Sequence, residues 1–414
     1  MPQLISDSDM IYLRATPIPR ALESVQQAFW GMYPPSARTA DFPTPTIITR
    51  APADETLYPN DGNCRRFAHL SRAFAQRTAD RWNDSDDMKY LTKLLSKWMP
   101  ENSKKVAVDS RPRLSGIMDT VNATLAHGPQ TRLPKEFYDQ KARDIIDQIG
   151  VEEWFSGYKE SAEYRMLGIG GLVGDIVSRM TGSVEHNGND GLMEIGGDEG
   201  NLGRGRGGER DIKFALSGCH DTTLAGLLCS LGAFDGEKWP PYTSHIAIEL
   251  FRKTDWMAPN TVPGRTSSSD EELKKVTVLK SQSWWSLVFG RTKGIVDGGI
   301  PEPEGIARKP MDQLTDEQKR TLRGYYVRIR YNDKIMQVPG CKQEGKHLEG
   351  DTTFCTLVSF DVLLFSTKNG TYHFLQEAFK SIADKYTPKN WKHACASNLC
   401  APLFPEQPEP AGYE

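Results

Sequence analysis

The sequence has few cysteines, and no two of them stand at the spacing of a zinc-binding or redox motif. Its seven cysteines are scattered, and the closest pair, Cys395 and Cys400, has no histidine at zinc-finger spacing. We therefore expect no metal site. The pairs Cys341 with Cys355 and Cys395 with Cys400 fit either disulfides of a secreted or luminal protein or reduced thiols, and both alternatives stay open.

The sequence also lacks a long apolar run. No stretch of about 18 apolar residues occurs, and the first ten residues, MPQLISDSDM, contain acidic side chains and no apolar segment typical of a signal peptide. We therefore predict no transmembrane segment, and the localisation stays unknown. Three N-x-S/T motifs, at Asn83, Asn122 and Asn369, would accept glycans only in the secretory pathway.

The sequence also lacks a large excess of charge of either sign. Lysine and arginine number 51 against 54 aspartates and glutamates, so the formal net charge is -3. Without a basic field the chain has no general attraction to a phosphate backbone, and we expect no nucleic-acid partner. Hydrophobic residues make up 38% and charged residues 25% of the sequence, which is typical of a globular protein.

The chain is predicted to begin with a strand, a tight turn and a helix. Residues 10–16 (MIYLRAT) alternate like a short strand, and the segment after Pro19 carries apolar residues at helical spacing. Residues 39–157 are mostly helical, with apolar stripes of period near 3.6. We expect a helical cap at 39–157 inserted into a discontinuous α/β core at 1–38 and 158–400, followed by a proline-rich tail at 401–414.

The core is expected to carry loop insertions at 186–210, which is rich in glycine, and at 254–322. Between them lie a strand pattern (IKFALSG, 212–218), a helical pattern and a second strand pattern (SHIAIELF, 244–251), and this β-α-β order predicts a parallel sheet. A further helix is predicted over 161–180, although glycines interrupt its stripe. The residues YYVRIRYND (325–333) predict another strand.

The sharpest local feature is SGCHDTT, residues 217–223, where a strand ends and a helix begins. Ligands of open α/β sheets bind at such carboxyl ends of strands. The imidazole of His220 could donate to a phosphate oxygen, and the carboxyl group of Asp221, when protonated, could deliver a proton to a leaving oxygen. The alternative, favoured by the dipeptide alone, is that both residues cap the helix.

A second feature is Arg14, near the end of the first predicted strand. A guanidinium at that place is suited to bidentate phosphate recognition, whereas the plainer interpretation is a surface arginine paired with a carboxylate. Arg20, in the predicted helix, is expected to face solvent or a helix carboxylate. Arg14 and the 217–223 segment support each other, because both place phosphate-compatible groups at strand ends of what could be one sheet.

Two segments together resemble the histidine acid phosphatases of the histidine phosphatase superfamily. YLRATPIPRALES, starting at Tyr12, resembles the block that supplies one phosphate-binding arginine, with Ala15 where the family commonly has serine. LSGCHDTTLAGLL resembles the block with the His-Asp pair. The resemblance implies a three-layer, phosphoglycerate mutase-like α/β core with a mostly parallel sheet and a helical cap, and fungal acid phosphatases and the lysophosphatidic acid phosphatase type as nearest relatives.

The same resemblance implies the site residues and the reaction. Arg14 and His220 would bind phosphate, and His220 and Asp221 would be catalytic in the hydrolysis of a phosphorylated small molecule or lipid through a phosphohistidine. No metal and no cofactor are required by this chemistry, and the oligomeric state stays unknown.

The family's Arg-His-Gly-x-Arg-x-Pro motif, which carries the nucleophilic histidine, should precede Arg14, but the thirteen residues before Arg14 contain no histidine. His69, His127, His186 and His245 stand in no such context. We therefore expect that this chain is truncated and lacks the nucleophile. The alternative is an inactive pseudophosphatase that binds phosphorylated ligands or a protein partner through the remaining pocket and a patch at Trp284 and Trp285. A third, weaker alternative is mutase or kinase-like chemistry on a sugar or inositol phosphate.

Overall fold

The computed structural model describes residues 11–39, 42, 46–185, 212–253, 306, 309–358, 366–367, 370–371 and 378–413. The chain divides into two units, of which the first comprises Met1–Arg252 and Gly305–Glu414. The second unit, Lys253–Glu304, lies outside the described residues apart from Lys253. All elements below belong to the first unit.

A parallel sheet of three strands carries the first predicted strand at its centre. The order is β2-β1-β3, with the bounds β1 Ile11–Ala15, β2 Ile47–Ile48 and β3 Phe214–Gly218. Every residue of β1 is buried, as expected for a central strand flanked on both sides. The register pairs Ala15 with Gly218, so the carboxyl ends of β1 and β3 lie at the same edge.

Helix α1 (Pro19–Met32) packs on this sheet, as the helical spacing predicts. Its buried residues, Ala21, Val25 and Phe29, are four positions apart and form one face. A Cβ atom on Gly218 would lie 2.5 Å from the carbonyl oxygen of Ala21, so glycine at the end of β3 allows α1 to approach.

The remaining long strands form an antiparallel sheet in the order β4-β5-β8-β7, with β6 paired to β5. Its bounds are β4 Ile246–Arg252, β5 Tyr325–Tyr331, β6 Lys334–Met336, β7 His347–Leu348 and β8 Asp351–Thr356. Asn332 and Asp333 join β5 to β6 with positive φ angles of 46° and 66°, the backbone of a tight hairpin turn. A short pair, β9 Ser366–Thr367 and β10 Gly370–Thr371, is also antiparallel.

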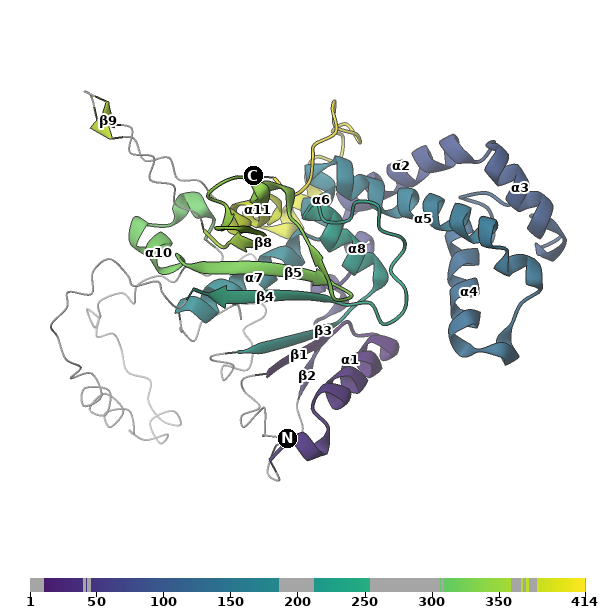
Figure 1. Ribbon diagram of the computed structural model, residues 1–414. Helices are drawn as coiled ribbons and strands as arrows, with labels where there is room; N and C mark the ends of the chain where they lie inside the picture. Colours follow the sequence, from purple (N-terminus) through teal and green to yellow (C-terminus); the bar gives the residue numbers. More distant parts are fainter. Residues whose placement is uncertain are drawn as a thin grey trace, which may run out of the picture. The chain divides into compact units, whose positions relative to one another are not determined.

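The α/β class with a parallel sheet is confirmed, but the two strands around residue 220, expected in one parallel sheet, lie in different sheets. In the described part of the chain β3 pairs with β1, whereas β4 pairs with β5 over seven positions, from Ile246 opposite Tyr331 to Arg252 opposite Tyr325. A β-α-β pattern is local, and the partner of β4 comes from more than 70 residues downstream. Figure 1 shows the two sheets with β3 and β4 on neighbouring edges.

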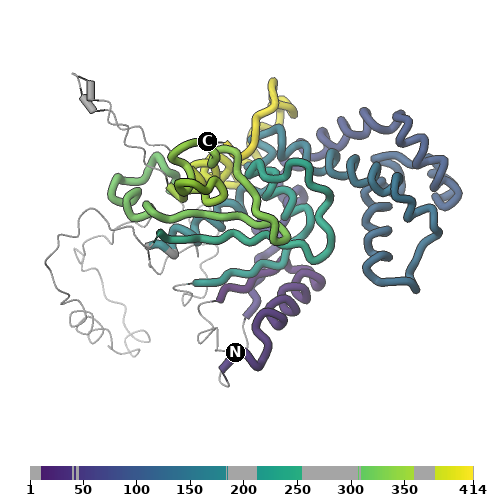
Figure 2. Tube along the Cα trace, in the orientation of Figure 1, coloured from purple at the N-terminus to yellow at the C-terminus, as the bar shows by residue number. Residues whose placement is uncertain are grey.

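The expected helical segment contains α2 Arg65–Trp82, α3 Asp86–Leu95, α4 Leu114–His127 and α5 Gln140–Glu160. In Figure 2 these blue helices lie to one side of the strands. Buried residues of α3, α4 and the first half of α5 form one hydrophobic cluster, whereas Phe155 and Tyr158 of α5 belong to the main core. Helix α5 therefore joins the two cores, and the cap boundary at residue 157 stays a prediction.

The helix predicted over 161–180 is two helices, α6 Ala162–Gly168 and α7 Gly170–Glu185. Their glycines lie where other chain segments approach closely. A Cβ atom on Gly168 would lie 2.5 Å from the hydroxyl oxygen of Tyr158, and one on Gly170 would lie 1.9 Å from the carbonyl oxygen of Tyr386. The glycines thus serve packing at the break.

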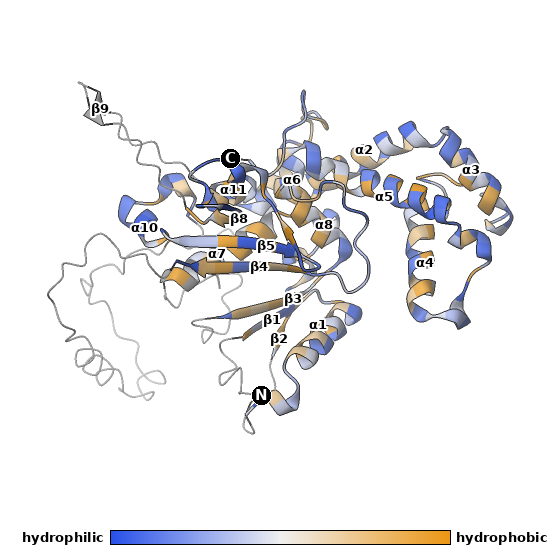
Figure 3. Cartoon of the chain, viewed as in Figure 1, coloured by the Kyte–Doolittle hydropathy of each residue, from blue (hydrophilic) through white to orange (hydrophobic). Residues whose placement is uncertain are grey.

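The other helices are α8 Asp221–Ser230, α10 Asp316–Thr321, α11 Phe379–Tyr386 and α12 Trp391–Ala396. Part of the long stretch expected as a loop insertion, 254–322, is thus helical at α10. Figure 3 shows apolar residues along β1, β3 and β4. Among the described helices, none has the length and hydropathy needed to cross a bilayer.

Two disulfides answer the question that the cysteine spacing left open. Cys341 pairs with Cys355, as one alternative had it. Cys395 pairs with Cys64 on α2, and not with Cys400, whose thiol is free and exposed. The glycine-rich segment at 186–210 and the Trp284–Trp285 patch lie outside the described residues.

Candidate functional site

The two sequence features meet where β1 and β3 end. Thr16 follows β1, and its backbone N–H donates to the carbonyl of Gly218 at 3.2 Å. His220 stands just before α8, and its Nε2 lies 3.1 Å from Oγ1 of Thr16. Parallel pairing of β1 with β3 therefore brings together residues that are 204 positions apart.

His220 is a half-buried imidazole with charges of both signs around it. Burial lowers its pKa, and the positive charge of Arg20 lowers this pKa further, while Asp221 and Glu55 act in the opposite direction. The ring of Tyr58 meets the imidazole edge-on, with centroids 6.1 Å apart. Arg20 is exposed, as expected, yet it acts electrostatically on the site.

Asp221 is the first residue of α8, so its carboxylate lies at a helix N-terminus. Its Oδ1 accepts the backbone N–H of Thr222 at 2.8 Å, and its Oδ2 accepts the indole N–H of Trp239 at 2.8 Å. Both residues thus lie at the start of the helix, as the capping interpretation expected: His220 is the N-cap residue and Asp221 is the first helical residue. Such a position also favours a bound anion.

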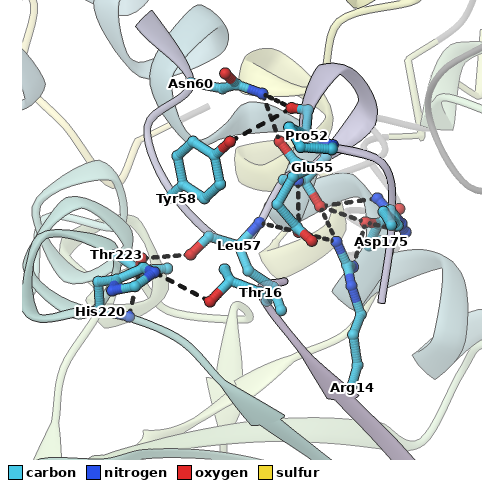
Figure 4. A network of polar contacts seen from close by, with 12 residues as sticks. Arg14, Thr16, Pro52, Glu55, Leu57, Tyr58, Asn60, Asp175, His220 and Thr223 are labelled. Atoms are coloured by element: carbon cyan, nitrogen blue, oxygen red, sulfur yellow. Dashed lines mark hydrogen bonds and ion pairs between the residues drawn. The ribbon is translucent and has the colours of Figure 1, made fainter. Parts of the chain in front are cut away.

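Arg14 lies beneath these residues in a buried ionic network, drawn in Figure 4. Its guanidinium donates to the carboxylate of Glu55, to Asp175 Oδ2 at 3.3 Å and to Thr56 Oγ1 at 3.0 Å. Arg50 donates to the same oxygen of Asp175 at 2.8 Å. Arg14 is therefore paired with carboxylates, as the plainer interpretation expected. It is only 2% exposed, however, and so is buried and not on the surface.

Residues 55–57 link this network to α8. The Oε1 atom of Glu55 accepts the backbone N–H groups of Thr56 at 2.8 Å and Leu57 at 2.7 Å. The carbonyl of Leu57 in turn accepts the hydroxyl of Thr223 at 2.6 Å, as Figure 4 shows. A shift of the Arg14 network would therefore reach the helix that carries Asp221.

Sequence reasoning missed Glu55, Asp175 and Trp239. Asp175 gave a usable signal, because it interrupts the apolar run LVGDIV in α7, and a charge in such a run needs a buried partner. Glu55 and Trp239 gave none, since both lie in irregular segments whose partners are distant in sequence.

The other histidines considered in the sequence lie elsewhere. His69 is in α2, His127 ends α4 and His245 precedes β4, while His186 lies outside the described residues. In the part of the chain that the structure describes, no three His, Cys, Asp or Glu side chains are grouped to hold a metal ion.

A surface cavity of about 440 Å³ lies on α2 and α5, lined by Arg77, Arg81 and Glu160 among others. Arg77 and Glu160 form an ion pair at 2.7 Å there, so the opposite charges neutralise each other. His220, Asp221 and the Arg14 network lie instead at the end of the parallel sheet.

Known proteins resemble this chain over most of its length. A probable acid phosphatase of Schizosaccharomyces pombe is 32% identical over 373 residues, which are 90% of this chain and 70% of that protein. The human lysophosphatidic acid phosphatase type 6 is 25% identical over 247 residues, or 58% of this chain and 48% of that protein. A probable acid phosphatase of Dictyostelium discoideum is 23% identical, over 64% of this chain and 53% of that protein.

The last two alignments span about half the length of the relatives that they match. The family profile described as histidine phosphatase superfamily, branch 2, matches residues 2–278. This range includes β1, the helices α2 to α8 and both segments on which the sequence resemblance rests. The chain therefore belongs to the histidine phosphatase superfamily, branch 2.

Proposed function

We propose that the full-length protein hydrolyses phosphomonoesters of small molecules or lipids as an acid phosphatase. The observation that carries this proposal is the meeting of His220, Asp221 and the Arg14 network at the carboxyl ends of β1 and β3. Membership of the superfamily and the names of the relatives, acid phosphatase and lysophosphatidic acid phosphatase, support the same reaction class.

In the proposed reaction a histidine supplied by an Arg-His-Gly segment attacks phosphorus. A P–N bond forms, the P–O bond to the leaving group breaks, and Asp221 gives its proton to the leaving oxygen. Water then cleaves the phosphohistidine and regenerates the histidine. His220 donates to a phosphate oxygen, and Arg14 reaches the phosphate once it exchanges a carboxylate partner for it.

The sequence contains no Arg-His-Gly, so in this proposal the nucleophile lies outside residues 1–414. Two strand edges support this part. Among the described strands, β3 ends the parallel sheet and β4 ends the antiparallel sheet. Residues 246–251 of β4 are all only partly buried although most are apolar, which is the edge expected where a further strand is absent.

The second candidate is a pseudophosphatase that binds phosphorylated ligands or a protein partner without turnover. The lack of Arg-His-Gly favours it for the chain as given. Phosphate binding without phosphate release would identify it.

The first test combines the N-terminal peptide and intact mass of the native protein with an assay of phosphate release. An upstream Arg-His-Gly together with turnover supports hydrolysis, whereas a native chain that begins at Met1 and binds phosphate without turnover supports the second candidate. A native protein that neither releases nor binds phosphate contradicts both candidate functions.

The second test addresses Asp221 in the active protein. Asp221→Asn should slow turnover of alkyl phosphates by about 10²–10⁴-fold, the usual contribution of a general acid, and spare p-nitrophenyl phosphate, whose leaving group needs no proton. The exposed residue Asp235 supplies the control, Asp235→Asn, which should leave both rates unchanged. Equal losses on both substrates would contradict the acid role.

A further inference from the structure

Both oxygens of the Asp221 carboxylate are held by N–H donors. One donor is the backbone of Thr222, which any residue at that position would supply. The other is the indole N–H of Trp239, 2.8 Å from Oδ2, which depends on this side chain. Tryptophan is a donor only, so this bond does not require Asp221 to carry a proton.

Trp239 is itself fixed by the helical part of the chain. Its backbone N–H donates to Oδ1 of Asp147 on α5 at 3.0 Å. Its ring packs on Phe155, with centroids 5.0 Å apart, and meets Trp154 edge-on at 6.1 Å. The half-buried indole contacts both hydrophobic clusters, so it lies where the main core meets the helical one.

We infer that Trp239 is a positioning residue for Asp221, through which the helical region orients the acid and favours its loss of the proton. This inference rests on the proposed hydrolysis. An N–H donor stabilises the ionised carboxylate more than the neutral acid, so the bond strengthens as the proton moves to the leaving oxygen.

Asp221 interacts electrostatically with His220, Cys219 and Tyr242. Further charges act on these groups and on the partner of Trp239: Arg20 of α1 on His220 and Tyr242, Asp119 of α4 on Tyr242, and Lys238 on Asp147 of α5. Trp239→Phe leaves every one of them in place and keeps an aromatic ring against Phe155. A change of activity in this variant therefore reports the lost N–H donor.

The first experiment needs no turnover. In the chain labelled with ¹⁵N-tryptophan, the indole signal that disappears in Trp239→Phe is followed with pH. We expect the indole signal to move as the pH is lowered, and we expect this movement to be lost in Asp221→Asn. The control is Trp82→Phe, which removes an indole bond to Glu152 of 3.0 Å in the helical region. A Trp239 signal that does not change with pH, or changes equally in Asp221→Asn, overturns the inference.

The second experiment measures turnover in the native, full-length protein. Trp239→Phe should lower kcat on alkyl phosphates about tenfold, which corresponds to about 1.4 kcal/mol, with KM and the kcat on p-nitrophenyl phosphate unchanged. Equal losses on both substrates, or a loss that appears in KM instead of kcat, would show a merely structural role and overturn the inference. If the native protein releases no phosphate, the proposed hydrolysis fails. The indole signal alone then decides whether Trp239 is hydrogen-bonded to Asp221.

Discussion

Glu55→Gln tests whether the buried network holds Arg14 back from phosphate. Two positive groups, Arg14 and Arg50, face two negative groups, Glu55 and Asp175, and all four side chains are at most 5% exposed. The substitution keeps the shape of the side chain but removes one of the negative charges beside Arg14. Removing one partner of a buried ion pair costs about 3–5 kcal/mol.

At about 2 °C per kcal/mol for a large chain, this loss should lower Tm by roughly 6–10 °C. Added phosphate should then return part of the stability, because the dianion replaces the missing charge beside Arg14. A ligand at a hundred times its Kd stabilises the folded state by about 2.7 kcal/mol. Thermal unfolding with and without inorganic phosphate measures both effects.

A matched control is Glu101→Gln, because Glu101 pairs with Lys104 at 2.9 Å but is 94% exposed. This exposed pair should contribute at most about 1 kcal/mol. Equal Tm values for the two variants would refute the expectation that the buried ion pairs stabilise the folded state more than the exposed pair does. An equal phosphate effect on Glu55→Gln and the unmodified chain would refute the idea that Glu55 competes with phosphate for Arg14.

Two further predictions concern stability. Gly170→Ala should lower the free energy of unfolding by about 1–3 kcal/mol, because the added Cβ atom would meet a backbone carbonyl of α11. Gly116→Ala in α4 should raise this free energy by about 0.5–1 kcal/mol, because no atom lies within 4 Å of the added Cβ. Urea unfolding measures both changes, and two changes of the same sign would contradict the packing argument. For His220, burial lowers the pKa of the folded state, so its stabilising effect is complete above the unfolded pKa of about 6.5 and is lost as the pH falls below it. His220→Gln should therefore lose less stability than the unmodified chain between neutral and acidic pH, and parallel curves would contradict this assignment.

The sequence predicts best what depends on neighbouring residues. The strand around Arg14, helix α1 and the strand-to-helix turn at His220 all follow from local spacing, and parallel pairing then predicts that Arg14 and His220 converge. The pairing of β4 cannot be found in this way, because a short apolar strand fits either a parallel or an antiparallel partner. Its partner is decided by the rest of the sheet.

The contacts that complete the site are also not local. Glu55 and Asp175 reach Arg14 from 41 and 161 positions away, and no spacing rule connects such residues. Trp239 follows a loop after α8, and its approach to Asp221 depends on where α5 lies. The roles of Arg14, His220 and Asp221 stay predictions.

The disulfide between Cys64 and Cys395 joins residues 331 positions apart and closes the chain between them into a covalent ring. His220 and Asp221 lie inside this ring, whereas Arg14 lies on the open segment before it. A single proteolytic cut within the ring would yield a nicked, two-chain form whose pieces separate only after reduction. A cut between Thr16 and Cys64 would instead leave the Arg14 peptide attached through non-covalent contacts alone. After proteolysis, Arg14 can therefore be lost without reduction, whereas His220 and Asp221 stay covalently attached to the rest of the protein.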